Sequence, residues 1–233
     1  MRIRYKPWAR PELEASKFYI DNPQDYKGKW KELFKKEAPI HLELGCGKGK
    51  FISELAVKNK NINYIAIDVV DAMLGLAKRN IEKKYAQENE EIDNVYITRF
   101  DIERILLMLD EEDKIERIYI NFCNPWPKGR HRKKRLTHRI QLEKYKQFLI
   151  KGGEIRFKTD DDDLFRDSLI YFKDTGFKII KYTYDLEKEI EKENEQGNQS
   201  EKEGKFWDNI QTEHEKMFIE QGIKIKAVIA KKE

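Results

Sequence analysis

One glycine-rich stretch constrains the fold of this chain more than any other. A buried strand is expected over residues 40–44, and three alternating glycines follow it: Gly45, Gly47 and Gly49. A run with helical character begins at about Lys50. This order brings backbone N–H groups and a helix N-terminus to one point, where glycines let a ligand approach the backbone closely. The stretch is not a P-loop, because Phe51 stands where that loop needs Ser or Thr, and it lacks the third glycine of a dinucleotide fingerprint.

Acidic residues stand at the ends of the first two expected strands. Glu43 precedes the first glycine by two residues, and Asp68 follows a second expected strand over residues 63–67. A carboxylate at the second position suits a ribose diol, because it can accept both hydroxyl protons. This spacing resembles that of the class I methyltransferases, which bind S-adenosylmethionine. The alternative is a tight strand–helix turn in another kind of α/β protein.

The composition indicates a globular chain rather than a disordered or exported one. The 233 residues suit one α/β domain with a full core, with or without extensions. The net charge is only +4, so overall charge predicts no partner. No apolar run approaches the roughly 18 residues of a membrane span, and no secretory signal is present. Two cysteines, Cys46 and Cys123, form no disulfide framework, and a cytoplasmic setting is expected.

Hydrophobic periodicity predicts strands alternating with helices from residue 40 onward. The clearest helical stripe follows Asp71 and carries Leu74, Ala77, Ile81 and Tyr85. The seven expected strands cover residues 40–44, 63–67, 95–98, 118–122, 154–158, 177–184 and 223–230. The pattern predicts an α/β fold with a seven-stranded, mostly parallel, Rossmann-like sheet and helices on both faces.

Ligands of such sheets bind beyond the carboxyl ends of the strands. Polar or acidic residues occupy five of these ends: Glu43, Asp68, Asp101, Asn124 and Asp160. Each alone would more often solvate a loop or cap a helix, but together they indicate a ligand site.

Two segments differ from this core in composition. Residues 1–39 are a basic and aromatic lead-in, expected to be either a solvated tail or an arm laid along a polyanion or across the active site. Residues 40–233 form the expected methyltransferase domain. Within it, residues 185–208 differ in composition and are expected to be a mobile insertion, because the run from Glu187 to Glu203 is nearly all polar and offers no buried face.

The stretch after the fourth strand is stiff and basic. Pro125 and Pro127 flank Trp126, and seven Lys or Arg without any acid lie between Lys128 and Arg139. Such a run at the ligand edge predicts a patch that tracks nucleic-acid phosphates, with an aromatic ring on which a base can stack. The alternative is a solvated basic face.

This stretch also carries a resemblance to a family. Residues 122–128 (Phe-Cys-Asn-Pro-Trp-Pro-Lys) and the following Arg-His-Arg-Lys-Lys-Arg-Leu resemble the signature of bacterial tRNA (guanine-N7)-methyltransferases. Supporting stretches are residues 26–30, 157–160 and 212–215, so the likeness covers nearly the whole chain apart from 185–208. The resemblance implies methyl transfer from S-adenosylmethionine to N7 of a guanine in tRNA, with guanine 46 of the variable loop as the family's target.

The resemblance also implies roles for individual residues. The cofactor contacts would be Glu43, Gly45, Gly47, Asp68, Asp101 and Asn124, and Asn124 would also be the catalytic position. The substrate contacts would be Lys128, Asp160, Thr212, Glu213, His214 and Glu215. The RNA-binding run would be Arg130, His131, Arg132, Lys133, Lys134 and Arg135.

Two positions depart from the family pattern. The family usually has Asp where this chain has Asn124, and Tyr where it has His214. Guanine N7 carries a free lone pair, so its methylation needs no strong general base and an amide need not disable the enzyme. Thr212 and Glu215 also fit a capping box that would start the last helix, with or without a ligand role.

Other functions stay open on the sequence alone. Asn124-Pro125-Trp126 resembles the Asn-Pro-Pro-aromatic loop of amino-methyltransferases, with Trp126 in place of the second proline. A non-catalytic RNA-binding module that kept the fold is the other alternative. No metal site is expected, because His131 and His138 have no third ligand at metal spacing. The preferred tRNA species and the oligomeric state, monomer or homodimer, cannot be predicted from the sequence.

Overall fold

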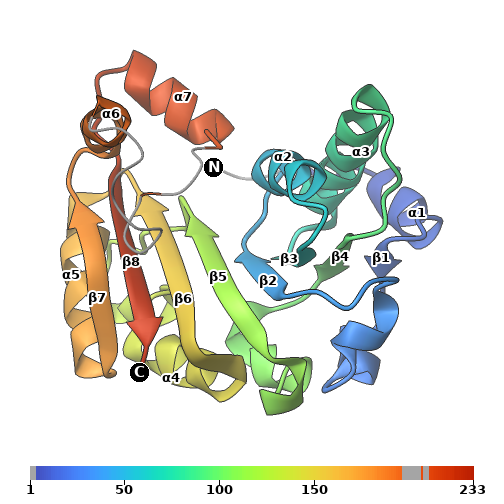
Figure 1. The fold of residues 1–233 in the computed structure, drawn as a ribbon, viewed down its shortest axis with the longest axis horizontal. Coiled ribbons are helices and arrows are strands. Elements are labelled where there is room, and N and C mark those ends of the chain that lie inside the picture. Colours follow the sequence, from blue (N-terminus) through green and yellow to red (C-terminus); the bar gives the residue numbers. More distant parts are fainter. Residues whose placement is uncertain (1–3, 196–205, 207–209) are drawn as a thin grey trace. The chain divides into compact units, whose positions relative to one another are not determined.

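The computed structural model describes residues 4–195, 206 and 210–233. The chain forms two compact units (Figure 1), the first made of Met1–Tyr119 with Gln147–Ile150 and the second of Ile120–Lys146 with Lys151–Glu233. It passes between them three times, within β5 (Ile115–Asn121), within α4 (Arg139–Phe148) and within β6 (Leu149–Thr159). The strand order is β1-β4-β3-β2-β5-β6-β8-β7. The predicted fold class, a mostly parallel α/β sheet flanked by helices, is confirmed, with eight strands in place of seven.

The first unit holds the parallel part of the sheet. It contains β2 (Ile40–Leu44), β3 (Asn63–Asp68) and β4 (Val95–Arg99), whose pairs run in parallel register. All five residues of β2 are buried, as expected for a strand covered on both faces. The helices of this unit include α2 (Lys50–Lys58) and α3 (Asp71–Gln87). The predicted stripe of α3 is confirmed, because Leu74, Ala77, Ile81 and Tyr85 are all buried.

The N-terminal segment is folded rather than a solvated tail. It forms α1 (Ala9–Glu14), the short strand β1 (Tyr19–Ile20) beside β4, and the 3-10 helices η1 (Pro23–Tyr26) and η2 (Trp30–Leu33). Trp30 has no exposed surface, and its Nε1 donates to the carbonyl of Met108 at 2.9 Å. The expectation of a solvated tail over residues 1–39 is therefore wrong for the part that carries these elements, whereas an arm laid along a polyanion or across the active site stays a prediction. The sequence did not predict this burial, because charged residues stand between the buried ones. It did not predict β1, because a strand of two residues is too short to show alternation.

The second unit adds the antiparallel part of the sheet. There β8 (Lys226–Lys232) runs antiparallel to β6 and to β7 (Phe177–Thr183). Its helices are α4 (Arg139–Phe148), α5 (Asp162–Asp174), α6 (Leu186–Glu195) and α7 (Glu213–Glu220), with the 3-10 helix η5 (Gly129–Lys134) before α4. In the part of the chain described, no helix is long and apolar enough to cross a membrane.

The expected insertion without a buried face is wrong in its first part. Residues 186–195 form α6, and Leu186 is 1% exposed in a cluster with Phe206, Ile225, Ala227 and Ile229. Ile190 packs against the same cluster. Leu186 and Ile190 are four residues apart, which places them on one helix face despite the charged residues between them. The remainder of the segment, residues 196–205 and 207–208, lies outside the described residues.

Candidate functional site

The glycine turn after β2 is fastened to the end of β3 in the first unit. The N–H groups of Gly45 and Cys46 both donate to the carbonyl of Ile67 at 2.9 Å. Gly49 has a φ of +67°, and a Cβ there would lie 2.6 Å from the Cβ of Ala77, so only glycine fits. By contrast, a Cβ on Gly47 would meet nothing within 4 Å. The turn therefore leaves open space beside Gly47.

Asp68 is the carboxylate that the turn holds. Its Oδ2 accepts the N–H of Gly47 at 2.9 Å, and its Oδ1 accepts the N–H of Val70 at 2.9 Å. Burial raises the pKa of Asp68 above its ordinary value, against the opposing effect of these N–H donors. Each carboxylate oxygen has a second lone pair, so Asp68 can accept further hydrogen bonds from a ligand.

Glu43 is more deeply buried than its place near the strand end suggested. Its side chain lies in β2 and is 2% exposed, and it pairs in register with Ala66 of β3. The role of Glu43 as a cofactor contact stays a prediction.

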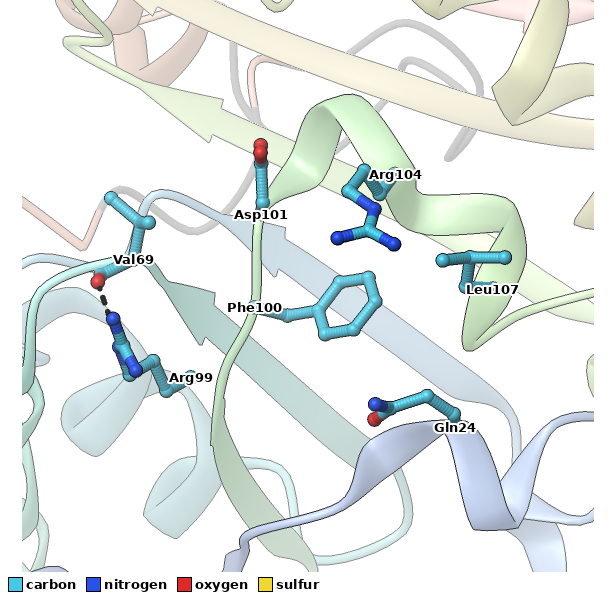
Figure 2. Close-up of a pocket in the computed structure, with 7 residues that line it drawn as sticks. All are labelled: Gln24, Val69, Arg99, Phe100, Asp101, Arg104 and Leu107. Carbon is cyan, nitrogen blue, oxygen red and sulfur yellow. Dashed lines mark hydrogen bonds between the residues drawn. The ribbon is translucent and has the colours of Figure 1, made fainter.

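A cavity of about 240 Å³ opens where β3 and β4 end. Figure 2 shows the ring of Phe100 facing Gln24, Arg104 and Leu107, while the carboxylate of Asp101 points away from that ring. The Oδ1 of Asp101 accepts the N–H of Glu103 at 2.9 Å and so caps η3 (Ile102–Leu107). Sequence reasoning found Asp101 but missed Gln24, which η1 brings to the cavity, and the apolar lining that Phe100 and Leu107 supply.

In the second unit, the loop after β5 is folded on itself around Asn124. The Oδ1 of Asn124 accepts the N–H of Trp126 at 3.0 Å, while the side chain as a whole is exposed. Phe122 and Trp126 both have a left-handed backbone, with φ of 51° and 44°. The indole of Trp126 stacks on His131 at 5.7 Å between ring centroids, and the Lys134 ammonium lies 5.3 Å from it. The predicted aromatic surface is therefore partly covered by the basic run itself.

The Lys and Arg side chains of the basic run are exposed except for Arg135, and His131 is half-buried. Lys128, Arg130, Arg132, Lys133 and Lys134 are all exposed along η5 and the residue before it. The Nε of Arg130 donates to Nε2 of His131 at 2.9 Å. Arg135 is only 1% exposed, so the expectation that it presents its charge to RNA is wrong. Its burial depends on partners elsewhere in the chain. The sequence of the basic run alone does not identify these partners.

Glu215 also turns inward. Its Oε2 lies 3.0 Å from Nζ of Lys158, and the two side chains are 2% and 1% exposed. The predicted capping box is confirmed, because Thr212 Oγ1 accepts the N–H of Glu215 at 3.0 Å and Glu215 Oε2 accepts that of Thr212 at 3.4 Å. The expected substrate contact of Glu215 stays a prediction, and its carboxylate already serves the cap and the ion pair with Lys158. The side chain of Glu213 lies outside the described part.

Besides the exposed Lys128, two candidate substrate residues remain accessible in the second unit. His214 is exposed, and its ring stacks on Phe122 at 5.9 Å between centroids with 24° between planes. Asp160 is half-buried, and its backbone carbonyl accepts Nζ of Lys226 at 2.8 Å. The Asp160 carboxylate takes part in none of the hydrogen bonds or ion pairs found among the described residues.

The cysteines fit packed thiols rather than nucleophiles. Burial raises the pKa of Cys46 well above its ordinary value and that of Cys123 to about 12, so neither is a thiolate near neutral pH. Within residues 4–195, 206 and 210–233, no three His, Cys, Asp or Glu side chains gather as a metal ion would need.

The comparisons with known proteins identify the family. Residues 37–222 match the family described as "Putative methyltransferase". A tRNA (guanine-N(7)-)-methyltransferase of Clostridium beijerinckii is 58% identical over 233 residues, which cover 100% of both chains. The chain belongs to the tRNA (guanine-N7)-methyltransferase family. A second member, from Clostridium perfringens, is 55% identical, again over 100% of both chains.

Solved structures support the methyltransferase fold at low sequence identity. The 16S rRNA methyltransferase KamB has a TM-score of 0.59 and 13% identity, with 87% of this chain and 92% of that chain covered. An antibiotic-related methyltransferase has a TM-score of 0.57 and 19% identity, with 89% and 92% covered. Both likenesses establish the Rossmann-like fold of this family member and nothing about its substrate.

Proposed function

We propose that the chain transfers a methyl group from S-adenosylmethionine to N7 of a guanine in tRNA. The observation that carries this proposal is the bond between the Asp68 carboxylate and the Gly47 N–H, beside the open space that Gly47 leaves. It is the arrangement that a ribose needs at the end of β3. The tRNA substrate is inferred from the names of the relatives that match the chain from end to end.

The residues of the first unit fit this cofactor. Asp68 keeps lone pairs for the two ribose hydroxyls, and the glycine turn admits a close ligand through Gly45 and Gly47. The cavity at Phe100 offers an aromatic face and an apolar wall to a flat ring, and Asp101 borders it. Glu43 completes the cofactor contacts proposed for the first unit, and the contact proposed for Asn124 belongs to the second unit.

The chemistry asks little of the protein beyond orientation. When bound, the cofactor supplies a methyl group on a positively charged sulfur, which is already activated. Guanine N7 presents a free lone pair, so no residue has to remove a proton. Holding the base in line with the methyl group can contribute on the order of 7–11 kcal/mol. Asn124 is the residue proposed to orient the base or the cofactor.

The second unit supplies groups suited to guanine and to its product. The half-buried carboxylate of Asp160 can accept the N1 and N2 hydrogens of guanine. The methylated base is cationic, so a nearby carboxylate also favours the transition state. His214, stacked on Phe122, offers a second flat surface where the family usually has Tyr. Lys128 and the exposed part of the basic run would hold RNA phosphates.

The test is to identify the methylated atom. Purified protein is incubated with S-adenosylmethionine and a tRNA transcript, and the digested nucleosides are separated by mass spectrometry against 7-methylguanosine. A matched transcript with guanine 46 replaced by adenine tests the proposed target. Methyl groups on an exocyclic amine would favour the amino-methyltransferase alternative. Binding of tRNA without any transfer would favour the RNA-binding module.

A further inference from the structure

We propose that Arg135 is a positioning residue, which holds the loop of Asn124 in one conformation and does not contact RNA. The inference rests on the proposed function, because that function makes the loop of Asn124 part of the methyl-transfer site. It concerns the second unit alone, where every contact that carries it is found.

The loop has a backbone that needs holding. Phe122 and Trp126, on either side of Asn124, adopt left-handed φ values of 51° and 44°. Bulky side chains rarely take this conformation, and it persists only where the surrounding structure fixes it. Besides the ring contacts of Phe122 and Trp126, hydrogen bonds to the loop backbone can fix it.

Among the described residues, hydrogen bonds hold the loop at Phe122, Pro125 and Trp126. The N–H of Phe122 donates to the carbonyl of Lys158 at 2.9 Å and ties the loop to β6. The N–H of Trp126 donates to Asn124 within the loop at 3.0 Å. Between them, the carbonyl of Pro125 accepts Nε of Arg135 at 2.7 Å. Because Pro125 has no N–H, its carbonyl is the one backbone group by which it can be held.

Arg135 is itself fixed on the other side. Its NH1 donates to Oδ2 of Asp167, on α5, at 2.5 Å, and its side chain is 1% exposed. The rigid fork of a guanidinium can make both bonds in one plane, which the point charge of a lysine cannot. The chain from Pro125 through Arg135 to Asp167 thus connects the loop to a helix.

The neighbouring basic residues behave differently. Arg132 lies 3.3 Å from the same Oδ2 of Asp167, but its side chain is 46% exposed. It can turn toward a phosphate while Arg135 keeps its carboxylate partner. A buried guanidinium that is already paired has no surface to offer to RNA, so the basic run divides into exposed members and one internal anchor.

The experiment compares Arg135→Lys, Arg135→Met and Asp167→Asn with the native protein. Asp174→Asn is the matched control, since Asp174 also lies on α5 and pairs with an arginine, Arg139, that makes no bond to the loop. Single-turnover methylation is measured at saturating S-adenosylmethionine and tRNA, and tRNA binding is measured as a function of salt. The ¹⁹F resonance of 5-fluorotryptophan at Trp126, assigned with Trp126→Phe, reports the loop without any need for activity.

A loop displaced by about 1 Å can cost on the order of 100-fold in rate. Both Arg135 variants should therefore lose rate together, Asp167→Asn should lose less, and Asp174→Asn should match the native protein. The Trp126 resonance should shift or broaden in the same order. The slope of log affinity against log salt should stay unchanged in Arg135→Met.

Opposite results would overturn the proposal. Arg135→Lys with native rate, together with a salt slope lower by about one in Arg135→Met, would make Arg135 a phosphate contact. If the Arg135 variants do not fold, Asp167→Asn with a native rate and a native Trp126 resonance decides against positioning. A native protein that transfers no methyl group would refute the proposed function, while the Trp126 resonance would still show whether Arg135 orders the loop.

Discussion

Lys158 and Glu215 form an ion pair that is almost closed to solvent, with Nζ and Oε2 3.0 Å apart. Lys158 lies near the end of β6, and Glu215 lies in the first turn of α7. The same Oε2 accepts the N–H of Thr212, so one carboxylate both caps α7 and ties it to the sheet of the second unit. This pair explains why α7 begins where it does.

Loss of this carboxylate should destabilise the second unit strongly. Removing one partner of a buried ion pair leaves an uncompensated charge and costs about 3–5 kcal/mol. Thr212→Ala removes only a capping bond, worth about 1 kcal/mol. We therefore expect Glu215→Ala to lower the free energy of unfolding, measured by urea denaturation, by several times as much as Thr212→Ala.

The double variant Lys158→Met/Glu215→Leu is the control for that prediction. It removes both charges, so it should be more stable than Glu215→Ala. If Glu215→Ala and Thr212→Ala lower the free energy of unfolding by equal and small amounts, the ion pair contributes little to the stability of the fold.

The sequence predicted the parts of the fold that local patterns determine. Residues 40–44 form β2 with the expected bounds, and the stripe of α3 is buried as periodicity required. The capping box of α7 was predicted because its two residues are three apart in sequence. β1 escaped notice because two residues show no alternation, and it is ordered only by pairing with β4.

The site was predictable to the same extent. Asp68 and Gly47 meet because consecutive parallel strands end at one edge, which follows from topology. The inward turns of Arg135 and Glu215 depend on Asp167 and Lys158, which lie 32 and 57 residues away in sequence. No local pattern distinguishes a buried arginine from its exposed neighbours. The sequence therefore predicted that all members of the basic run contact RNA.

Asp68→Ala should weaken cofactor binding and leave tRNA binding unchanged. The carboxylate is proposed to accept hydrogen bonds from the ribose, and a charge-assisted bond is worth about 1.5–3 kcal/mol. We expect S-adenosylmethionine affinity, measured by calorimetry, to fall roughly 10-fold to 100-fold. An unchanged affinity would remove Asp68 from the cofactor site.

The raised pKa of Asp68 should make cofactor affinity depend on pH. Burial favours the protonated form, so the carboxylate is lost as pH falls through a pKa above the ordinary value of 3.8. S-adenosylmethionine affinity should therefore decline as pH falls through that pKa. The stability contributed by Asp68 changes in the opposite direction and decreases as pH rises through the same pKa. Asp68→Asn should flatten this part of the affinity profile. Identical profiles for the two proteins would assign the titration to another group.

Neutralising the exposed basic run should affect RNA alone. Arg130→Gln, Arg132→Gln and Lys133→Gln together should lower the salt slope of tRNA binding by about 0.7–0.9 for each phosphate that the variant no longer neutralises, with cofactor affinity intact. The control is a triple Gln variant at exposed lysines elsewhere in the second unit, Lys151, Lys173 and Lys178. If both triple variants change the slope equally, the run is only one part of a general positive surface.

The last prediction concerns Asn124, where the family usually has Asp. Its Oδ1 accepts the N–H of Trp126 at 3.0 Å, and an aspartate can accept the same bond. Because guanine N7 needs no deprotonation, the native protein should be active, and Asn124→Asp should retain or exceed its rate, since the added charge favours a cationic product. Asn124→Ala loses about 0.5–1.5 kcal/mol of hydrogen bonding, which corresponds to a rate roughly 2-fold to 10-fold lower.

Single-turnover methylation of tRNA by the three proteins measures these rates. A native rate in Asn124→Ala would show that the side chain has no part in the transfer. A native protein without activity, together with an active Asn124→Asp, would mean that the amide disables the site and that binding of RNA is the function that remains. The two variants separate the role of Asn124 as a hydrogen-bond acceptor for the Trp126 N–H from the effect of charge at this position. A rate that is lost in Asn124→Ala and fully kept in Asn124→Asp would follow from the acceptor alone, because both Asn and Asp supply it. A gain in Asn124→Asp can come only from the added charge.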